Sequence, residues 1–358
     1  MTFLKSLLAF SMGLASLGGA YAKLDLSSPD NVVVYWGQNS FRGTGDLAQQ
    51  NLAYYCDDDN IDVIVLAFVM RVNGVGGVPE YDLADNSKDC PLFNGTNLAN
   101  CPQVGADINT CQSKGKTIIL SIGGATYSEG GFQSESAAQA GADLIWQTFG
   151  PSQGNSSAYR PFGNASVDGF DFDFEATVNN MAPFANRLRQ LSDADTSKPY
   201  FLTAAPQCPY PDLADQEILN GPVSIDVVWV QFYNNPCGLN SFIAGQDTQT
   251  TFNFEQWDNW AKNVSQNSKA RVMLGVPADT TAASTGYVPV SQLQPIIQYT
   301  KTFNSFGGVM MWDVTQAYGN PGFLSGVRGA LEQTTSRIQP TYRYPPMRPW
   351  RFGPLKHW

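Results

Sequence analysis

The chain has 358 residues, 31 of them acidic and 21 basic, with a net charge of −10, and is long enough for one large domain or two modest ones. So acidic a protein is a poor candidate for binding nucleic acid or an anionic membrane surface, and a neutral polymer suits it better. The single histidine, His357, is next to the last residue. Histidine-based triads and metal sites are therefore excluded, and we expect chemistry on carboxylates and tyrosine, with no cofactor and no metal.

Residues 1–22 have the features of a secretory signal peptide. Lys5 gives a short positive start, the stretch from Leu7 to Leu17 is apolar, and Ala20-Tyr-Ala22 matches an A-x-A cleavage site. No other stretch approaches the ~20 apolar residues that a membrane span needs. We therefore expect a protein that is secreted to the extracellular space or the cell wall.

The cysteines and the N-glycosylation sequons are also typical of a secreted protein. An even number of cysteines in a secreted chain predicts three disulfides, and the lack of a C-x-x-C pair argues against a zinc site. The cysteines are Cys56, Cys90, Cys101, Cys111, Cys208 and Cys237. Sequons for N-glycosylation, which predict a glycoprotein, occur at Asn94, Asn155, Asn164 and Asn263.

Eight apolar, β-branched runs recur along the chain and predict β-strands. They span residues 32–36, 61–69, 117–122, 167–174, 200–205, 225–232, 271–276 and 307–312. Helical patterns lie between most of them, for example Met181, Phe184 and Leu188 at the i, i+3, i+7 spacing of a buried helix face. Alternating strands and helices predict a parallel sheet, and eight such units in about 310 residues match a (β/α)₈ barrel.

An open doubly wound sheet is the alternative fold. It predicts a G-x-G-x-x-G phosphate loop after the first strand, whereas that strand here runs into Tyr35-Trp-Gly-Gln-Asn39. We therefore expect an α/β protein with a single barrel over residues 23–336. The connection from Val276 to Gly307 is only long enough for a loop and one helix, so no extra domain is expected before the last strand.

Two segments fall outside this pattern. Residues 71–103 form a Gly-, Asn- and Asp-rich loop that contains Cys90 and Cys101, and we expect a stapled wall beside the site. Residues 337–358 are rich in Pro, Arg and aromatic side chains, which predicts a flexible tail. A small surface-binding peptide is the alternative interpretation of this tail.

The most informative stretch covers residues 167–175, where carboxylates and aromatic rings alternate. Successive side chains of a strand point to opposite faces, so Asp171, Asp173 and Glu175 share one face and three Phe share the other. Like charges in a row repel one another and resist burial, so stability alone does not explain them. A calcium site or a solvated edge is the alternative, but calcium sites usually lie on loops and an edge would not carry three Phe. We predict coupled acids, one of which stays protonated as a general acid.

Polar or aromatic residues stand at the carboxyl ends of most of the predicted strands, where a barrel holds its active site. For any one of these residues, packing or turn formation is a sufficient explanation. It does not explain why such residues occur at the ends of most of the strands. The set predicts one site built from several strands. Its members are Tyr35, Gln38, Phe68, Ser121, Gly123, Gly124, Asp173, Glu175, Gln207, Gln231, Tyr233, Asn234 and Trp312.

These strand motifs together resemble a known family. Asp168-x-x-Asp171-x-Asp173-x-Glu175 is similar to the D-x-x-D-x-D-x-E signature of glycoside hydrolase family 18, and Ser121-Ile-Gly-Gly124 resembles its S-x-G-G strand. The stretches at 32–39, 203–209, 229–236 and 307–312 resemble strands of its class III members, the hevamine-type chitinases of plants and fungi. The resemblance covers roughly residues 30–335 and implies a barrel that hydrolyses β-1,4-linked N-acetylglucosamine in chitin.

The resemblance also implies roles for individual residues. Glu175 matches the proton donor, Asp173 the residue that orients the acetamido group, and Asp171 the carboxylate behind it. Tyr233 matches the hydroxyl that bonds the reacting acetamide, and Trp312 the floor of the −1 sugar site. The other substrate-binding residues that we expect are Tyr35, Phe68, Gly124, Gln231 and Asn234.

The cysteine pattern resembles that of the plant members and implies the pairs Cys56–Cys111, Cys90–Cys101 and Cys208–Cys237. Asp313 after the floor Trp differs from the plant members, and we expect a fungal-like member of the class.

The expected activity is that of an endo-chitinase acting on chitin or chitooligosaccharides as a monomer, with retention of configuration. Adjacent carboxyls cannot both ionise cheaply, so Asp171 and Asp173 are expected to share a proton. The substrate's acetamide oxygen then acts as the nucleophile, while Glu175 serves first as acid and later as base. Two alternatives stay open, an endo-β-N-acetylglucosaminidase acting on N-glycans and a non-catalytic lectin or inhibitor. The usual mark of the last class is loss of the proton donor, and Glu175 is present.

Overall fold

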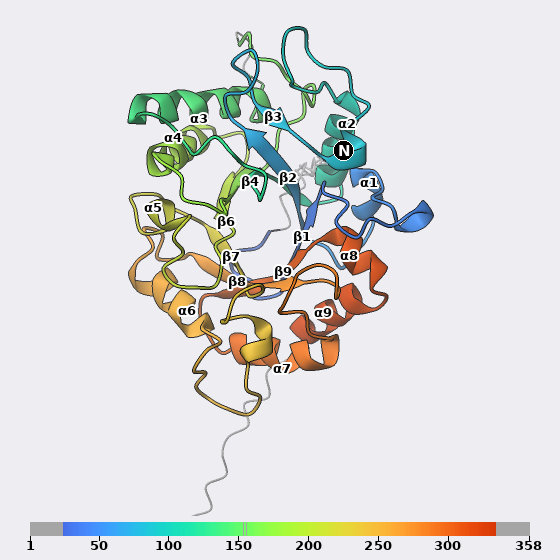
Figure 1. Ribbon diagram of the computed structural model, residues 1–358, viewed down its shortest axis with the longest axis vertical. Helices are drawn as coiled ribbons and strands as arrows, with labels where there is room; N and C mark the ends of the chain where they lie inside the picture. Colours follow the sequence, from blue (N-terminus) through green and yellow to red (C-terminus); the bar gives the residue numbers. More distant parts are fainter. Residues whose placement is uncertain (1–23, 153, 155, 334–358) are drawn as a thin grey trace, which may run out of the picture.

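We describe a computed structural model of the chain, in which residues 24–152, 154 and 156–333 are placed well enough to describe (Figure 1). The expected signal peptide, the expected tail at 337–358 and the sequon at Asn155 lie outside the described residues.

The core of the fold is a closed barrel of parallel strands. Strand β1 pairs with β2 through Val33 and Val63 and with β9 through Val33 and Met310, which closes the ring. A short strand, β3 (Glu80–Tyr81), lies antiparallel on the end of β2. The expected (β/α)₈ barrel is therefore confirmed. The barrel strands are β1 (Asn31–Trp36), β2 (Val63–Arg71), β4 (Thr117–Gly123), β5 (Gly169–Asp173), β6 (Phe201–Ala204), β7 (Val227–Gln231), β8 (Arg271–Pro277) and β9 (Phe306–Trp312).

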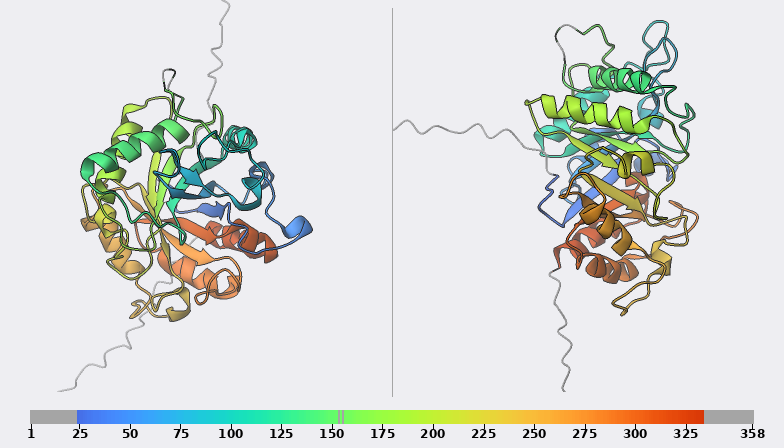
Figure 2. Two further views of the ribbon diagram at one scale, coloured as in Figure 1. Left: turned by 45° about the horizontal axis from the view of Figure 1, so that its top comes forward. Right: turned by 90° about the vertical axis from the view of Figure 1, so that its left-hand side faces the viewer.

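Helices surround the strands on the outside (Figures 1 and 2). The predicted stripe of Met181, Phe184 and Leu188 is buried on α4, as its spacing requires. The α-helices are α1 (Leu52–Tyr55), α2 (Pro102–Ser113), α3 (Glu135–Phe149), α4 (Met181–Ala194), α5 (Gln216–Leu219), α6 (Phe254–Asn263), α7 (Val290–Thr300), α8 (Val314–Gly319) and α9 (Phe323–Glu332). Short 3₁₀ helices are η1 (Gly45–Leu47), η2 (Ala84–Asn86) and η3 (Leu239–Ser241). None of the helices in the described residues is long and apolar enough to cross a membrane.

The wall of the barrel separates the hydrophobic core into an outer part, between strands and helices, and an inner part inside the barrel. On β5, Phe170 and Phe172 pack in the layer between the strands and the helices, and Phe174 joins them just beyond the strand. Full burial of each ring stabilises the fold by about 1.5–3 kcal/mol. The alternate side chains, Asp171 and Asp173, therefore point into the barrel.

The loops between the barrel strands are arranged as the sequence predicts. Residues 278–305 contain only α7, so no domain is inserted between β8 and β9. The loop after β2 is ordered by β3, η2 and the disulfide Cys90–Cys101. The other disulfides are Cys56–Cys111, between α1 and α2, and Cys208–Cys237, between the loops that follow β6 and β7. These are the three pairs that the resemblance implies.

Candidate active site

A cavity of about 230 Å³ opens at the carboxyl ends of the strands. Its lining residues end or follow β4, β5, β6, β7, β8 and β9, so distant segments of the chain meet in one place. They are Ala125, Asp173, Glu175, Gln207, Gln231, Tyr233, Asn234, Asn235, Ala282 and Trp312. Six of the residues that the sequence singled out as catalytic or substrate-binding are among them.

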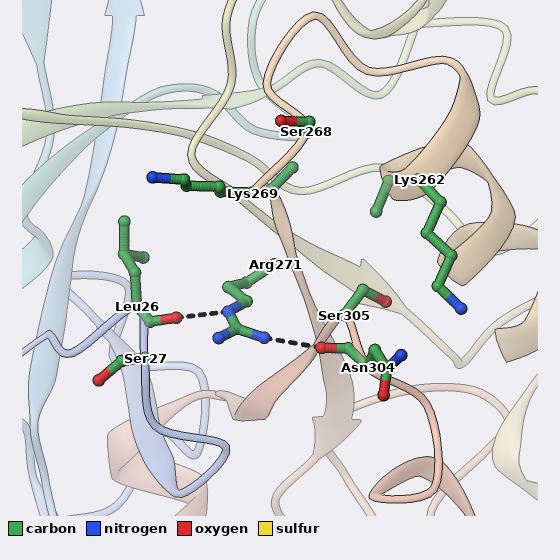
Figure 3. A pocket seen from close by; sticks show the side chains of 10 residues that line it. Leu26, Ser27, Lys262, Ser268, Lys269, Arg271, Asn304 and Ser305 are labelled. Carbon is green, nitrogen blue, oxygen red and sulfur yellow. Dashed lines mark hydrogen bonds between the residues drawn. The ribbon is translucent and has the colours of Figure 1, made fainter.

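A larger cavity, of about 480 Å³, lies at the other end of the barrel (Figure 3). It is lined by Arg271, the first residue of β8, and by Ser305, just before β9. The Arg271 guanidinium donates hydrogen bonds to the backbone carbonyls of Leu26 and Asn304 and so ties loops together. This end of a barrel usually serves stability, so we place the candidate site at the smaller cavity.

Asp171 lies beneath the site with no exposed surface and accepts four hydrogen bonds. Strand register places Ser121 and Thr203 on either side of it, and their hydroxyls donate at 2.6 and 2.8 Å. Tyr35 Oη and Trp229 Nε1 donate from other strands at 2.7 and 2.9 Å. Burial raises the pKa of Asp171, and these donors partly counter the rise by stabilising the carboxylate.

Asp173 is the next inward side chain on β5 and is almost fully buried. Its Oδ1 accepts a hydrogen bond from Nε2 of Gln231 at 3.0 Å, and the same nitrogen donates to the carbonyl of Ala205 at 2.8 Å. Burial, followed by the negative charges of Glu175 and Asp171, raises the pKa of Asp173 well above its usual range. Asp173 is therefore the member of the row best suited to hold a proton.

Glu175 follows β5 at the mouth of the cavity and is exposed to solvent. The cavity walls still remove part of its carboxyl from water, which raises its pKa. Tyr233 faces it from the loop after β7 and is buried. Burial, and next the charges of Asp173 and Glu175, raise the pKa of the Tyr233 phenol far above neutral pH, so it remains a hydrogen-bond donor.

An aromatic floor closes the bottom of the cavity. The rings of Trp312 and Phe68 stack with their centroids 5.9 Å apart, and Tyr35 lies 5.5 Å from Trp312. Phe68 and Tyr35 are buried and absent from the cavity lining, so they support Trp312 from below. Gly124 also lies below the cavity, where a Cβ would come within 2.7 Å of the Phe68 ring. Tyr35, Phe68, Gly124 and Asp171 are thus beneath the cavity and do not line it.

Asn234 has a structural use that the sequence did not reveal. Its side-chain oxygen accepts hydrogen bonds from the backbone amides of Ser284 and Thr285 at 2.8 and 3.2 Å, which fixes the loop after β8. Asn235 was not among the predicted site residues, and its amide donates to Oε1 of Gln207 at 3.0 Å in the same cavity. Its place just after a strand end, next to Asn234, is the sequence signal that could have identified it.

A closed barrel with a row of carboxyls above an aromatic floor is the kind of site that glycoside hydrolases use. The chain belongs to glycosyl hydrolases family 18, whose family model matches residues 31–291. The resemblance inferred from the strand motifs is therefore confirmed.

Two curated relatives are similar over nearly the whole chain. One is a class III chitinase of Arthroderma benhamiae, 50% identical over 94% of this chain and 96% of its own. The other is endochitinase 33 of Trichoderma harzianum, 46% identical over 91% of this chain and 99% of its own.

Solved structures of the same fold include enzymes and inhibitors. A chitinase from Ipomoea carnea is 28% identical with a TM-score of 0.66, over 84% of this chain and 99% of its own. A xylanase and α-amylase inhibitor protein is 31% identical with the same TM-score, over 84% of this chain and 98% of its own. The fold alone therefore does not decide between catalysis and inhibition.

Proposed function

We propose that the protein is a secreted endo-chitinase that hydrolyses β-1,4 linkages between N-acetylglucosamine units with retention of configuration. The observation that carries the proposal is the intact acid row. Glu175 is at the cavity mouth with a raised pKa, and Asp173 and Asp171 lie in line beneath it. The relatives named class III chitinase and endochitinase support chitin or chitooligosaccharide as the substrate.

In the proposed reaction Glu175 protonates the oxygen of the leaving sugar. The acetamide oxygen of the sugar in the −1 site attacks its own C1 and forms an oxazolinium ion, so the protein supplies no nucleophile. Water then opens this ring, and Glu175 takes the proton back as a base. Trp312 supports the sugar ring from below.

The surroundings of Asp171 indicate which of the two carboxyls, Asp171 or Asp173, holds the proton that they were expected to share. Four donors point at its two oxygens, so the carboxylate form uses all its acceptor sites and leaves no room for a proton. The proton of the pair therefore resides on Asp173. In that form Asp173 can turn toward Glu175 or the acetamide, while Tyr233 donates to the acetamide oxygen.

The non-catalytic alternative has one observation in its favour, the likeness to inhibitor proteins. The presence of Glu175 in the cavity argues against it. The discriminating experiment offers the full-length protein a chitin oligomer and, separately, an N-glycosylated protein. We expect soluble oligomers from the first and no released glycan from the second. Glycan release without chitin cleavage would mean an endo-β-N-acetylglucosaminidase, and no cleavage of either would mean a binding or inhibitor protein.

A further inference from the structure

Two aromatic rings stack on each other at the surface, outside the candidate active site. The ring centroids of Phe93 and Tyr159 are 4.6 Å apart, and the ring planes lie 21° from parallel. Phe93 is in the loop after β2, and Tyr159 lies between α3 and β5. Tyr159 is 40% exposed, and Leu92, next to Phe93, is 57% exposed. Neither ring lines the cavity of the candidate site, so the proposed mechanism makes no use of this apolar surface.

The ring pair adjoins a tight turn that holds a glycosylation sequon, Asn94-Gly95-Thr96. The backbone N–H of Thr96 donates to the carbonyl of Phe93 at 3.1 Å, and the Thr96 hydroxyl donates to the same oxygen at 2.9 Å. Gly95 has a φ of +76°, which suits the third residue of such a turn. Asn94 is exposed. The turn therefore fixes an accessible Asn side chain next in the chain to one of the stacked rings.

The other two sequons among the described residues have no exposed ring in the turn or helix that holds them. Asn164 also lies in a turn opened by a phenylalanine, because the Ala165 N–H donates to the carbonyl of Phe162 at 3.2 Å, but this ring is only 3% exposed. Asn263 ends α6, whose aromatic rings are all buried, and its side-chain nitrogen donates to Asn259 at 2.7 Å. Of these three sequons, the one beside the ring pair is therefore the one with exposed aromatic surface next to its attachment point.

We propose that Asn94 carries an N-linked glycan, and that the first N-acetylglucosamine of this glycan packs on the ring pair of Phe93 and Tyr159. In the attachment step Asn94 Nδ2 forms a bond to C1 of the sugar, while the bond from C1 to the diphosphate of a lipid-linked oligosaccharide donor breaks. One proton of the Asn94 amide passes to the released diphosphate. The C–H face of a pyranose ring is apolar, so its packing on an aromatic ring removes apolar surface from water. The inference rests on the secretion in the proposed function and not on its catalysis.

A chitin chain is built from the same sugar and is the competing occupant of the rings. The attached glycan is favoured because its first sugar is tethered one residue from Phe93, and tethering gives it an effective concentration that a free chain does not reach. The tethered sugar has already lost most of its independent motion, so its packing costs less ordering entropy.

Occupancy of Asn94 is the first test. The full chain is secreted from a eukaryotic host, and its tryptic peptides are mapped by mass spectrometry before and after enzymatic release of N-glycans. We expect the peptide that contains Asn94 to carry a glycan. A bare Asn94 in protein recovered from the medium would overturn the inference and leave the proposed function intact. If the protein is also absent from the medium, the proposed secretion fails with it.

Thermal unfolding tests whether the sugar lies on the rings. Asn94→Gln removes the glycan, and we expect Tm to fall by about 1–3 °C. Trimming the wild-type glycan to its first sugar with an endoglycosidase should leave Tm unchanged, because only that sugar packs on the rings. In a Tyr159→Ala background the same Asn94→Gln change should have little further effect. Asn164→Gln is the matched control, because it removes a sequon from a turn whose ring is buried and should not change Tm.

Two results would overturn the packing of the sugar. If Asn94→Gln lowers Tm equally with and without the Tyr159 ring, the glycan stabilises the protein without contacting the rings. If Asn94→Gln increases retention on insoluble chitin and Tyr159→Ala removes the increase, the rings bind substrate chains instead. We expect equal retention, and an unchanged kcat/KM on a chitin oligomer, for wild type and both variants, because neither side chain lines the cavity. The Tm results hold whether or not the protein cleaves chitin.

Discussion

Asp171 and Asp173 are two residues apart on the same strand, yet they differ in their surroundings and therefore in their roles. Asp171 accepts four hydrogen bonds, whereas Asp173 accepts one from Gln231 and lies between two other carboxyls. Donors stabilise a charge and nearby like charges oppose it, so the two acids differ in proton affinity although they are the same residue type.

Glu175→Gln is the direct test of the general acid. The substitution is nearly isosteric and removes only the transferable proton, so we expect kcat on a chitin oligomer to fall by about 10²–10⁴-fold. Because the Glu175 side chain is exposed to solvent, the Tm should stay close to that of wild type. Retention of more than roughly a tenth of wild-type kcat would assign the acid to another group.

If the substrate's own acetamide is the nucleophile, the enzyme should select for N-acetylated sugars at the −1 subsite. A glucosamine unit lacks the acetyl oxygen, so we expect it to be refused at the −1 site and tolerated elsewhere along the groove. Hydrolysis of partly deacetylated chitin should therefore leave N-acetylglucosamine at each new reducing end, as the β-anomer. Mass-spectrometric sequencing of the product ends measures this. Frequent glucosamine there would make a protein carboxylate, Asp173 first, the nucleophile.

At the scale of elements, the end of β4 links the acid row to the aromatic floor. The Gly124 amide donates to the carbonyl of Asp173 at 2.7 Å, and its φ of +75° is a conformation that L side chains rarely adopt. A Cβ there would also meet the Phe68 ring, which stacks under Trp312.

Gly124→Ala should therefore disturb both stability and substrate binding. The left-handed backbone costs about 1–2 kcal/mol for a residue with a Cβ, and displacement of Phe68 adds to this. We expect a lower Tm and a higher KM. The matched control is Gly130→Ala, with a φ of +70° and open space around its Cβ position, which should lower Tm by the backbone cost alone and leave KM unchanged. Equal effects of the two variants on KM would show that Phe68 does not couple Gly124 to the floor.

The connection between β8 and β9 holds one helix and no wall beside the groove. An open groove can grip a polymer in mid-chain and release it readily, so early products from long chains should be mixed oligomers. Chromatography of the first products measures this. Dimer as the dominant product from the first turnovers would indicate an exo-acting or processive enzyme.

At the scale of the whole molecule, buried acids dominate the electrostatics. The pKa values of Asp173, Asp215, Asp226 and Asp313 are all raised, with burial as the largest cause. The net charge of −10 adds self-repulsion to the folded state as carboxyls ionise.

Stability should accordingly be highest in mild acid. A group with a raised folded-state pKa stabilises the fold fully below its unfolded value, near pH 3.9 for Asp, and loses that contribution as pH rises toward its folded value. We expect Tm to be highest near about pH 4 and to fall toward pH 8, as followed by calorimetry in one buffer series. A Tm that rises steadily over this range would mean that charged, paired carboxylates control stability instead.

Much of this architecture follows from local pattern. Each predicted strand lies within two residues of an observed one, because a buried parallel strand is a continuous apolar run that needs no knowledge of its partners. The acid row was equally visible, because a strand's period of two separates Asp171, Asp173 and Glu175 from the Phe face whatever the neighbouring strands are.

The tertiary structure alone decided what surrounds each of these groups. Tyr35 and Phe68 were expected at strand ends like Trp312, but ring packing across three strands puts them beneath the cavity floor. Asp215 lies outside every strand motif, and its pKa is raised by burial, by the charge of Asp212 in its own loop and by the charges of Asp173 and Asp171 on β5. Burial, strand register and the distances between charges depend on segments that folding brings together. The sequence of a single strand therefore determines which side chains face inward, but not which of them keeps its proton.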